Sequence, residues 1–365
     1  MVTMDYNLND LPLQSLFAPV TDATAALTRL DERVSRSDIK QGWVERMHYQ
    51  DACASLWIDG ELVHMEDLVL HDASRDIQTP SHVLTIAAAV LRARRRIDRH
   101  APGWALDVNG LRSLRNTTHD QSPSDPEQQE NAQPLPADKT ADALIAQMAE
   151  IDAILARSEA LLVEASMPTM RDRRPHNALV YEADWDEDAR FAQWQTVLRT
   201  STHLPAVLRA ALLIDAWNQL QVLQHSSWLG RVLVSDFLRG QGGFCHLAAL
   251  NVGLRQAPIE QRTSRNRTKR LLAILEGFQA TAHSGFKLHD KLSLAHQQMQ
   301  HRIGERRQSS HLPALIELVL TKPLISAEMV AGVLSITPRS ALRLIDQLSL
   351  REMTGRGRFR AWGVV

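Results

Sequence analysis

The sequence predicts a nearly all-α fold that ends in a winged helix-turn-helix with a short β wing. Apolar residues recur at helical spacing through most of the 365 residues, which is the pattern of amphipathic helices. Outside the C-terminal wing, no alternating run of strand character exceeds about five residues, so no other sheet is expected. This length is enough for about two or three domains, each with its own core.

The N-terminal region, residues 1–114, is predicted to be helical. Thr21 or Asp22 can cap one helix, and two more are expected over residues 40–56 and 80–99, since caps and apolar periodicity mark them. Arginines crowd the end of the last helix, where cations complement the negative end of the helix dipole. A stabilising role is therefore expected for them, in preference to nucleic-acid contact.

Residues 115–140 form a polar stretch with four prolines and almost no apolar side chains. Such a segment buries too little apolar surface to offset the entropy of ordering, which predicts a disordered linker. The following region, residues 141–308, is predicted to be a helical core. It opens with an apolar stripe from Leu144 to Leu162 that suits a helical hairpin or a weak coiled coil. Its later helices are predicted at residues 186–199, 205–224, 228–239, 244–254, 265–283 and 286–305, and the second of these is expected to be central and buried.

The last region, residues 309–365, carries the clearest functional signal. Ser326 can cap a helix that runs to Leu334, and Thr337 can cap a second helix with Pro338 at its first position. Such side chains satisfy an orphan backbone N–H, while proline lacks one that the helix would not use. Ser335 takes the turn position where this motif usually has glycine. The pattern favours a helix-turn-helix, with an unrelated helical hairpin as the alternative.

The outer face of the second helix is polar and basic, as in a helix that reads base edges and phosphates. A glycine-rich basic segment ending in Trp362 follows and is predicted to form the wing. The predicted DNA-binding residues are Thr337, Arg339, Ser340, Arg343, Arg356, Arg358 and Arg360. Auxiliary phosphate contacts are predicted from Arg262, Arg265, Arg267, Lys269 and Arg270. These would add affinity and salt dependence without sequence choice.

The net charge of −1 conceals a strong asymmetry along the chain. Residues 255–365 carry a net charge of +10, and the remainder carries −11. A basic region beside an acidic one is typical of a protein that binds a polyanion at one end. Basic residues that only solvate helix surfaces are the alternative interpretation. The expected partner is double-stranded DNA.

Other classes of function find little support in the composition. No segment approaches the roughly 18 to 20 apolar residues that span a bilayer, and the acidic N-terminus lacks the apolar core of a secretory signal. We therefore expect no membrane contact and a cytoplasmic location. The cysteines, Cys53 and Cys245, are far apart and are expected to be free thiols. Neither a metal site nor a cofactor is expected.

Parts of the chain resemble the Fic family, enzymes that transfer AMP or related groups from nucleotides to protein hydroxyls. The segment DACASLWIDGELVHMEDLVLHD, residues 51–72, is similar to a family stretch that ends in S-x-x-x-E-G, with Ser55, Asp59 and Gly60 in the matching places. The segment HSSWLGRVLVSDFLRGQG, residues 225–242, follows a buried helix where the family has its catalytic loop. Many such proteins also end in a winged helix. The resemblance implies a multi-helix Fic-like body.

The family signature HPFxxGNGRxxR supplies a general base, a metal carboxylate and a glycine-rich turn that cradles a diphosphate. In this chain two serines follow His225, Arg231 follows Gly230 in place of asparagine, and no acidic residue separates His225 from Gly230. A catalytically degenerate body is therefore expected, without catalytic or metal-binding residues. Asp59 is expected to cap the turn at Gly60.

The sequence thus predicts a DNA-binding protein, either a transcriptional regulator or a plasmid-maintenance factor, whose Fic-like body serves dimerisation or sensing. A homodimer is expected because one helix-turn-helix reads only a few base pairs. The first alternative is a Fic-type AMP transferase acting on a protein hydroxyl, with a site around His225, Ser227 and Arg231. The second is a non-catalytic interaction scaffold. The whole chain also resembles uncharacterised rhizobial proteins that end in a helix-turn-helix.

Overall fold

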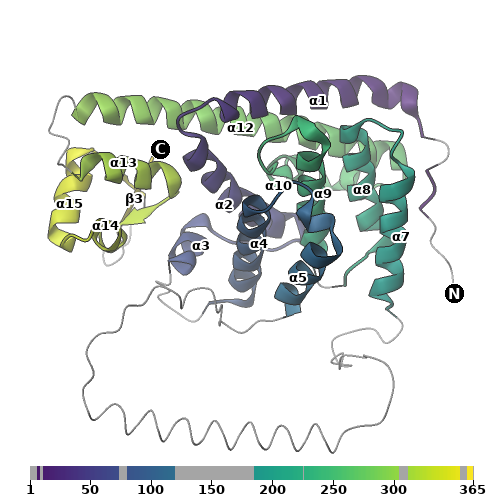
Figure 1. Cartoon of the computed structure of the whole chain (residues 1–365), viewed down its shortest axis with the longest axis horizontal. Helices are drawn as coiled ribbons and strands as arrows, with labels where there is room; N and C mark the ends of the chain where they lie inside the picture. The colour runs from purple at the N-terminus through teal and green to yellow at the C-terminus, as the bar shows by residue number, and fades with distance from the viewer. Residues whose placement is uncertain are drawn as a thin grey trace, which may run out of the picture. The chain divides into compact units, whose positions relative to one another are not determined.

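Helices make up nearly all of the regular structure in the computed structural model, which describes residues 6–8, 11–73, 80–119, 185–224, 226–303, 311–353 and 360–364 (Figure 1). The predicted all-α fold with a short β wing is confirmed. Every described residue except Trp185 belongs to one compact unit. Within these ranges, no helix has both the length and the apolar composition needed to cross a membrane.

The N-terminal region folds into α-helices and one 3-10 turn. Their bounds are α1 (Leu13–Ser35), α2 (Lys40–Ile58), α3 (Met65–Asp72), α4 (His82–Arg99), η1 (Trp104–Leu106) and α5 (Val108–His119). The caps predicted at Thr21 or Asp22 are wrong: α1 begins well before them, and the Thr21 hydroxyl donates to the carbonyl of Phe17 inside the helix. Because α5 reaches His119, the predicted linker begins inside a helix. Its remaining residues, 120–140, lie outside the described ranges.

The second half of the body contains α7 (Glu187–Thr200), α8 (Ala206–Leu220), α9 (Ser227–Leu238), η3 (Arg239–Gly243), α10 (Leu250–Leu254), α11 (Ile259–Arg262) and α12 (Arg267–Ile303). The helix predicted at residues 244–254 is largely wrong, since only α10 forms. The amides of Cys245 and His246 donate to the Asp31 carboxylate instead of to helix carbonyls. The two helices predicted between residues 265 and 305 are a single one, α12.

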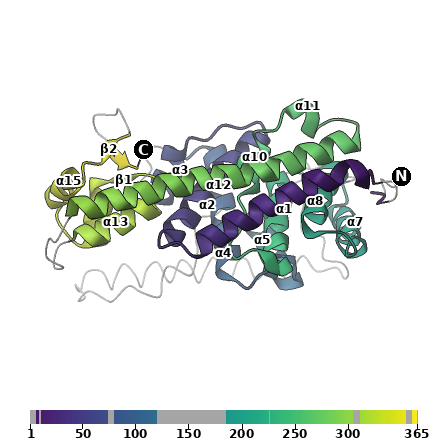
Figure 2. The ribbon, with the colours of Figure 1, turned by 90° about the horizontal axis from the view of Figure 1, so that it is seen from above.

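Two long helices, α1 and α12, lie side by side along one face of the body (Figure 2). Helix α8 packs against α7, α9 and α12, and its apolar side chains from Val207 to Leu220 are almost fully buried. The expectation that this helix is central is therefore confirmed. The regions predicted as separate, residues 1–114 and 141–308, share one core where they are described, because α2 packs on both α10 and α12.

The C-terminal elements gather beside the far end of α12 (Figure 1). They are α13 (Leu312–Thr321), β1 (Ile325–Ser326), α14 (Ala327–Leu334), α15 (Pro338–Gln347), β2 (Arg351–Glu352) and β3 (Ala361–Gly363). The strands form an antiparallel sheet in the order β1-β3-β2, with Trp362 of β3 opposite Ile325 and Glu352. This is the arrangement of a winged helix-turn-helix.

Candidate nucleic-acid interface

The two helices of the helix-turn-helix begin where the sequence predicts. The Ser326 hydroxyl accepts a hydrogen bond from the Met329 N–H at 3.1 Å, and the Thr337 hydroxyl accepts one from the Ser340 N–H at 3.2 Å. Between them Ser335 has a φ of +53°, in the left-handed region that glycine adopts most cheaply. The turn therefore keeps the geometry of the motif with a serine in the strained position.

Small and branched apolar side chains hold the two helices together. Val330 and Ala331 of α14 are buried, as are Ala341 and Ile345 of α15. Leu334, Ile336 and Leu344 are half-buried at the edge of this contact. One face of α15 is thus fixed in the core of the domain, and the opposite face is left to solvent.

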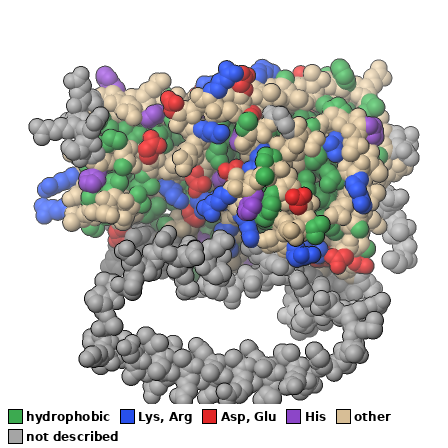
Figure 3. Space-filling view, viewed as in Figure 1, with side chains coloured by type: hydrophobic (Ala, Val, Ile, Leu, Met, Phe, Trp, Pro, Cys, Tyr) green, Lys and Arg blue, Asp and Glu red, His purple; other side chains and the backbone are tan. Residues whose placement is uncertain are grey.

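That solvent face carries the predicted DNA-reading side chains. Arg339, Ser340 and Arg343 are all exposed, and basic side chains stand out over α15 in the space-filling view (Figure 3). The hydroxyls of Ser340 and Thr337 bond to each other at 2.9 Å, so both serve the helix cap. Neither Arg339 nor Arg343 forms a hydrogen bond or ion pair with another described residue. An unpaired guanidinium on such a face is suited to guanine edges and phosphates.

Arg360 of the wing is held by other side chains, unlike the two arginines of α15, which have no partner among the described residues. Arg360 is exposed, yet its Nε and Nη2 donate to the Glu352 carboxylate at 2.9 and 2.6 Å, and its guanidinium lies 5.2 Å from the centre of the Trp362 ring. A phosphate would have to compete with Glu352 for it. The predicted contacts from Arg356 and Arg358 lie outside the described residues.

The five auxiliary residues do not form one basic surface. Arg265 and Lys269 are exposed. Arg262 is half-buried, donates to the Ala257 carbonyl and faces the Trp57 ring, while Arg267 donates to the Asn7 carbonyl and faces the Tyr6 ring.

The phosphate contact predicted for Arg270 is wrong. This residue is buried, and its Nε and Nη2 donate to the two oxygens of Asp215 at 2.6 and 3.1 Å. A polar run in the sequence gave no sign of the carboxylate that α8 brings to it.

Three of the positions that carry the Fic resemblance meet in the structure. The buried Arg231 of α9 donates through Nη2 to the Ser55 hydroxyl at 3.0 Å, the Ser55 carbonyl at 3.2 Å and the Asp59 carboxylate at 2.7 Å. Asp59 ends α2, and Gly60 follows with a φ of +91°. The Asp59 carboxylate thus holds α9 against α2, a role beyond the turn cap that was predicted.

Gly230, another position of the Fic resemblance, gives no sign of an anion loop. Gly230 lies in α9 against α8, where a Cβ would come within 2.2 Å of the Trp217 ring. Glycine is therefore required there by close helix packing. His225 lies outside the described residues.

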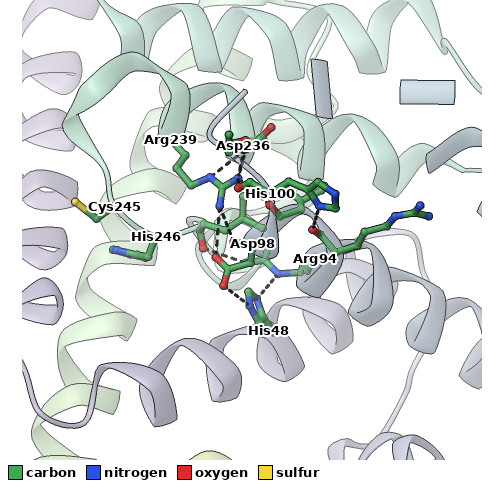
Figure 4. Close-up of polar contacts among 12 residues, drawn as sticks. His48, Arg94, Asp98, His100, Asp236, Arg239, Cys245 and His246 are labelled. Atoms are coloured by element: carbon green, nitrogen blue, oxygen red, sulfur yellow. Dashed lines mark hydrogen bonds and ion pairs between the residues drawn. The ribbon is translucent and has the colours of Figure 1, made fainter. Parts of the chain in front are cut away.

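Sequence reasoning missed a network of buried charges between α2, α4 and α9 (Figure 4). Arg94, fully buried, donates to Asp51 at 2.6 Å and to the carbonyls of Leu247 and Ala248. The neighbouring His48 lies 3.8 Å from Asp98, and its burial lowers its pKa even though Asp98 favours the charged form. The sequence predicts only that the arginines at the end of α4 complement the helix dipole, and nothing near them in the sequence indicates these distant partners.

Arg239, the first residue of η3 directly after α9, belongs to the same network. Its side chain donates to carbonyls at the C-terminal end of α4, those of Ile97, Asp98 and the C-cap residue His100, and pairs with Asp236 (Figure 4). Basic side chains commonly satisfy carbonyls at helix C-termini in this way. The network links α2, α4 and α9, and we therefore assign it a structural role.

Comparisons with known proteins match two parts of the chain separately: part of the helical body, which runs from α1 to α12, and the C-terminal elements from α13 to β3, which form the reading domain. Residues 179–304 match a family described as a protein of unknown function (DUF1612), and residues 312–365 match a family described as an HTH DNA binding domain. The chain is 50% identical over 381 residues to "Uncharacterized protein y4cF" of Sinorhizobium fredii, across 99% of this chain and 100% of that protein. The chain therefore belongs to the same protein family as this relative, with an HTH DNA binding domain at its C-terminal end.

Proposed function

We propose that the protein is a sequence-specific DNA-binding regulator of transcription or of plasmid maintenance, and that α15 enters the major groove. The observation that carries this proposal is the outer face of α15, where Arg339 and Arg343 project without partners among the described residues. A firmly capped helix with unpaired arginines on its solvent face suits the recognition helix of a helix-turn-helix. The match of residues 312–365 to an HTH DNA binding domain supports the same role.

The test is a salt titration of binding to a random-sequence DNA duplex, followed by fluorescence anisotropy with the full chain. For the Arg339→Ala/Arg343→Ala variant we expect weaker binding. The slope of log affinity against log salt concentration should also become less steep by up to about 2, because each lost phosphate contact reduces its magnitude by about 0.9. Arg92→Ala/Arg112→Ala is the matched control, since it removes two exposed arginines elsewhere. Failure of the wild-type chain to bind duplex DNA at low salt would overturn the proposal.

We further propose that the protein acts as a homodimer. One helix-turn-helix reads only a few base pairs, and two-fold symmetric pairs are the usual means of extending the site. The stripe at Leu144 to Leu162, predicted as the interface, lies outside the described residues. Sedimentation equilibrium of the full chain tests this: a monomer that also binds DNA as a monomer contradicts it.

The body is proposed to be non-catalytic. Support comes from Gly230, which is packed against Trp217, and from Arg231, whose Nη2 is occupied by Ser55 and Asp59. Neither residue is presented to a nucleotide. Incubation with labelled ATP and a bacterial extract tests the alternative of AMP transfer. Labelling of proteins that depends on the wild-type chain and disappears in His225→Ala would establish the transferase instead.

A further inference from the structure

Helix α2 of the body packs closely against the reading domain at the C-terminal end of α13. Helix α2 approaches so closely that a Cβ on Gly42 would lie 2.9 Å from the carbonyl oxygen of Leu320. One turn later Arg46, which is only 6% exposed, donates to the carbonyls of Val319, Leu320 and Lys322 at 2.5, 2.7 and 2.8 Å. The last carbonyls of a helix lack partners within the helix and form the negative end of its dipole. Arg46 therefore caps the first helix of the reading domain from outside that domain.

This contact is costly to open. Burial lowers the pKa of Arg46 to about 10, which reflects the loss of water around the guanidinium. Among the described residues, its hydrogen bonds run only to main-chain carbonyls of this one helix end. If α13 moved away, a buried guanidinium and several carbonyls would lose their partners together, and each unsatisfied buried group carries a large penalty. The body and the reading domain are thus expected to move as one piece.

Two further contacts tie the same parts together. Lys322, directly after α13, donates to the Tyr49 hydroxyl at 3.0 Å and to the Asp72 carboxylate at 3.1 Å. At the far end of α12, Arg302 donates to the carbonyl of Leu348 at 2.6 Å. Because Leu348 is the C-cap of α15, the recognition helix is held by α12 as α13 is held by α2.

We propose that Arg46 is a positioning residue for DNA reading, which couples the DNA occupancy of α15 to the state of α2. The proposal rests on the proposed function. By thermodynamic reciprocity, DNA bound at α15 stabilises α2 against opening, and the opening of α2 weakens DNA binding by the same factor. Without the junction, DNA would stabilise only the domain that binds it.

Cys53 provides a reporter for this coupling. It lies in α2, two turns beyond Arg46, and it is buried, whereas Cys245 is exposed. In the full chain with Cys245→Ser, labelling of Cys53 by a thiol reagent measures how often α2 opens. We expect a saturating random-sequence duplex to slow this labelling at least tenfold. With Arg46→Ala added, the protection should fall below about twofold while the duplex remains bound, since folding of the two parts is no longer cooperative.

If Arg46→Ala does not fold, a less disruptive variant tests the same coupling. Lys322→Ala/Arg302→Ala removes the two outer contacts and is expected to lose part of the protection, whereas Arg36→Ala, at an exposed position after α1, is expected to keep all of it. If DNA binds the wild-type chain without slowing Cys53 labelling, or if the junction variants keep full protection, the coupling is refuted. If the wild-type chain does not bind the duplex, the proposed function fails and the coupling fails with it.

Discussion

Helices α4 and α15 both carry closely spaced arginines, yet the fold uses them in opposite ways. Arg94 and Arg95 of α4 face carboxylates: Arg94 pairs with Asp51 in the interior, and Arg95 pairs with Asp72 and Glu45 at its edge. Arg339 and Arg343 of α15 face solvent and meet no carboxylate among the described residues. A row of arginines therefore acquires its role from the acidic groups that other elements bring to it, or from their absence.

The largest loss of stability is expected when Arg94 is replaced. Arg94→Ala leaves Asp51 buried without its cation and removes the hydrogen bonds to Leu247 and Ala248. Breaking a buried pair in this way destabilises a protein by about 3–5 kcal/mol. Urea denaturation should show that loss, whereas Arg92→Ala, exposed on the same helix, should stay within about 0.5 kcal/mol of wild type. Equal stabilities of the two variants would remove the contrast between the helices.

A smaller effect is expected from acid at His48, which borders Arg94. Burial lowers the pKa of His48 in the folded protein, so between that pKa and about 6.5 the unfolded chain holds a proton that the folded chain lacks. The free energy of unfolding is then expected to fall with decreasing pH by up to about 1.4 kcal/mol per pH unit from this one group. Denaturation at a series of pH values should show a shallower dependence in His48→Gln. His203→Gln, at an exposed position, should follow wild type.

Within the reading domain the expected effects on stability are modest. Ser335 has a φ of +53°, a conformation that glycine adopts more cheaply than serine. We expect Ser335→Gly to remove about 1–2 kcal/mol of left-handed strain. Because glycine adds about 0.4–1 kcal/mol of entropy to the unfolded chain, the net rise in the free energy of unfolding should be about 1 kcal/mol or less. Thermal unfolding measures the gain. Because Ser335 lies in the turn and away from the arginine face, DNA affinity should not change, and a large loss of affinity would assign the turn to the interface.

The smallest effect on stability belongs to the arginines of α15. Arg339→Ala/Arg343→Ala removes two exposed side chains that have no partner among the described residues, so the free energy of unfolding should change by less than about 0.5 kcal/mol. The same variant is the one expected to lose DNA affinity. Circular dichroism melts and binding curves on one preparation separate the two properties. A marked fall in the melting temperature would mean that these arginines stabilise the fold as those of α4 do.

The sequence was most informative where structure is local. Ser326, Thr337 and Pro338 mark helix starts through bonds that span only a few residues, and these starts were predicted correctly. Long-range partners were not predictable. Arg270 meets Asp215 and Arg94 meets Asp51 only after helices distant in the chain have packed.

The sequence predicts two helices, residues 265–283 and 286–305, with a break at Ser284 and Gly285 that α12 does not show. This error also has a long-range cause. Glycine lowers helix propensity, but the body overrides this preference through packing and through the Trp43 indole N–H, which donates to the Gly285 carbonyl at 2.9 Å. Propensity alone could not anticipate a contact from a helix more than two hundred residues earlier.

The unbroken α12 has a mechanical consequence. Its 37 residues give a length of about 55 Å at about 1.5 Å per residue. A tilt of only about 2° at its first turn would displace the other end by about 2 Å over that length, and that end holds the Leu348 carbonyl beside the recognition helix. Such a displacement is several times the roughly 0.5 Å range of donor–acceptor distances over which an N–H···O hydrogen bond forms. If α15 reads DNA as proposed, a slight repacking near Arg267 would therefore shift the recognition helix relative to the bases that it contacts.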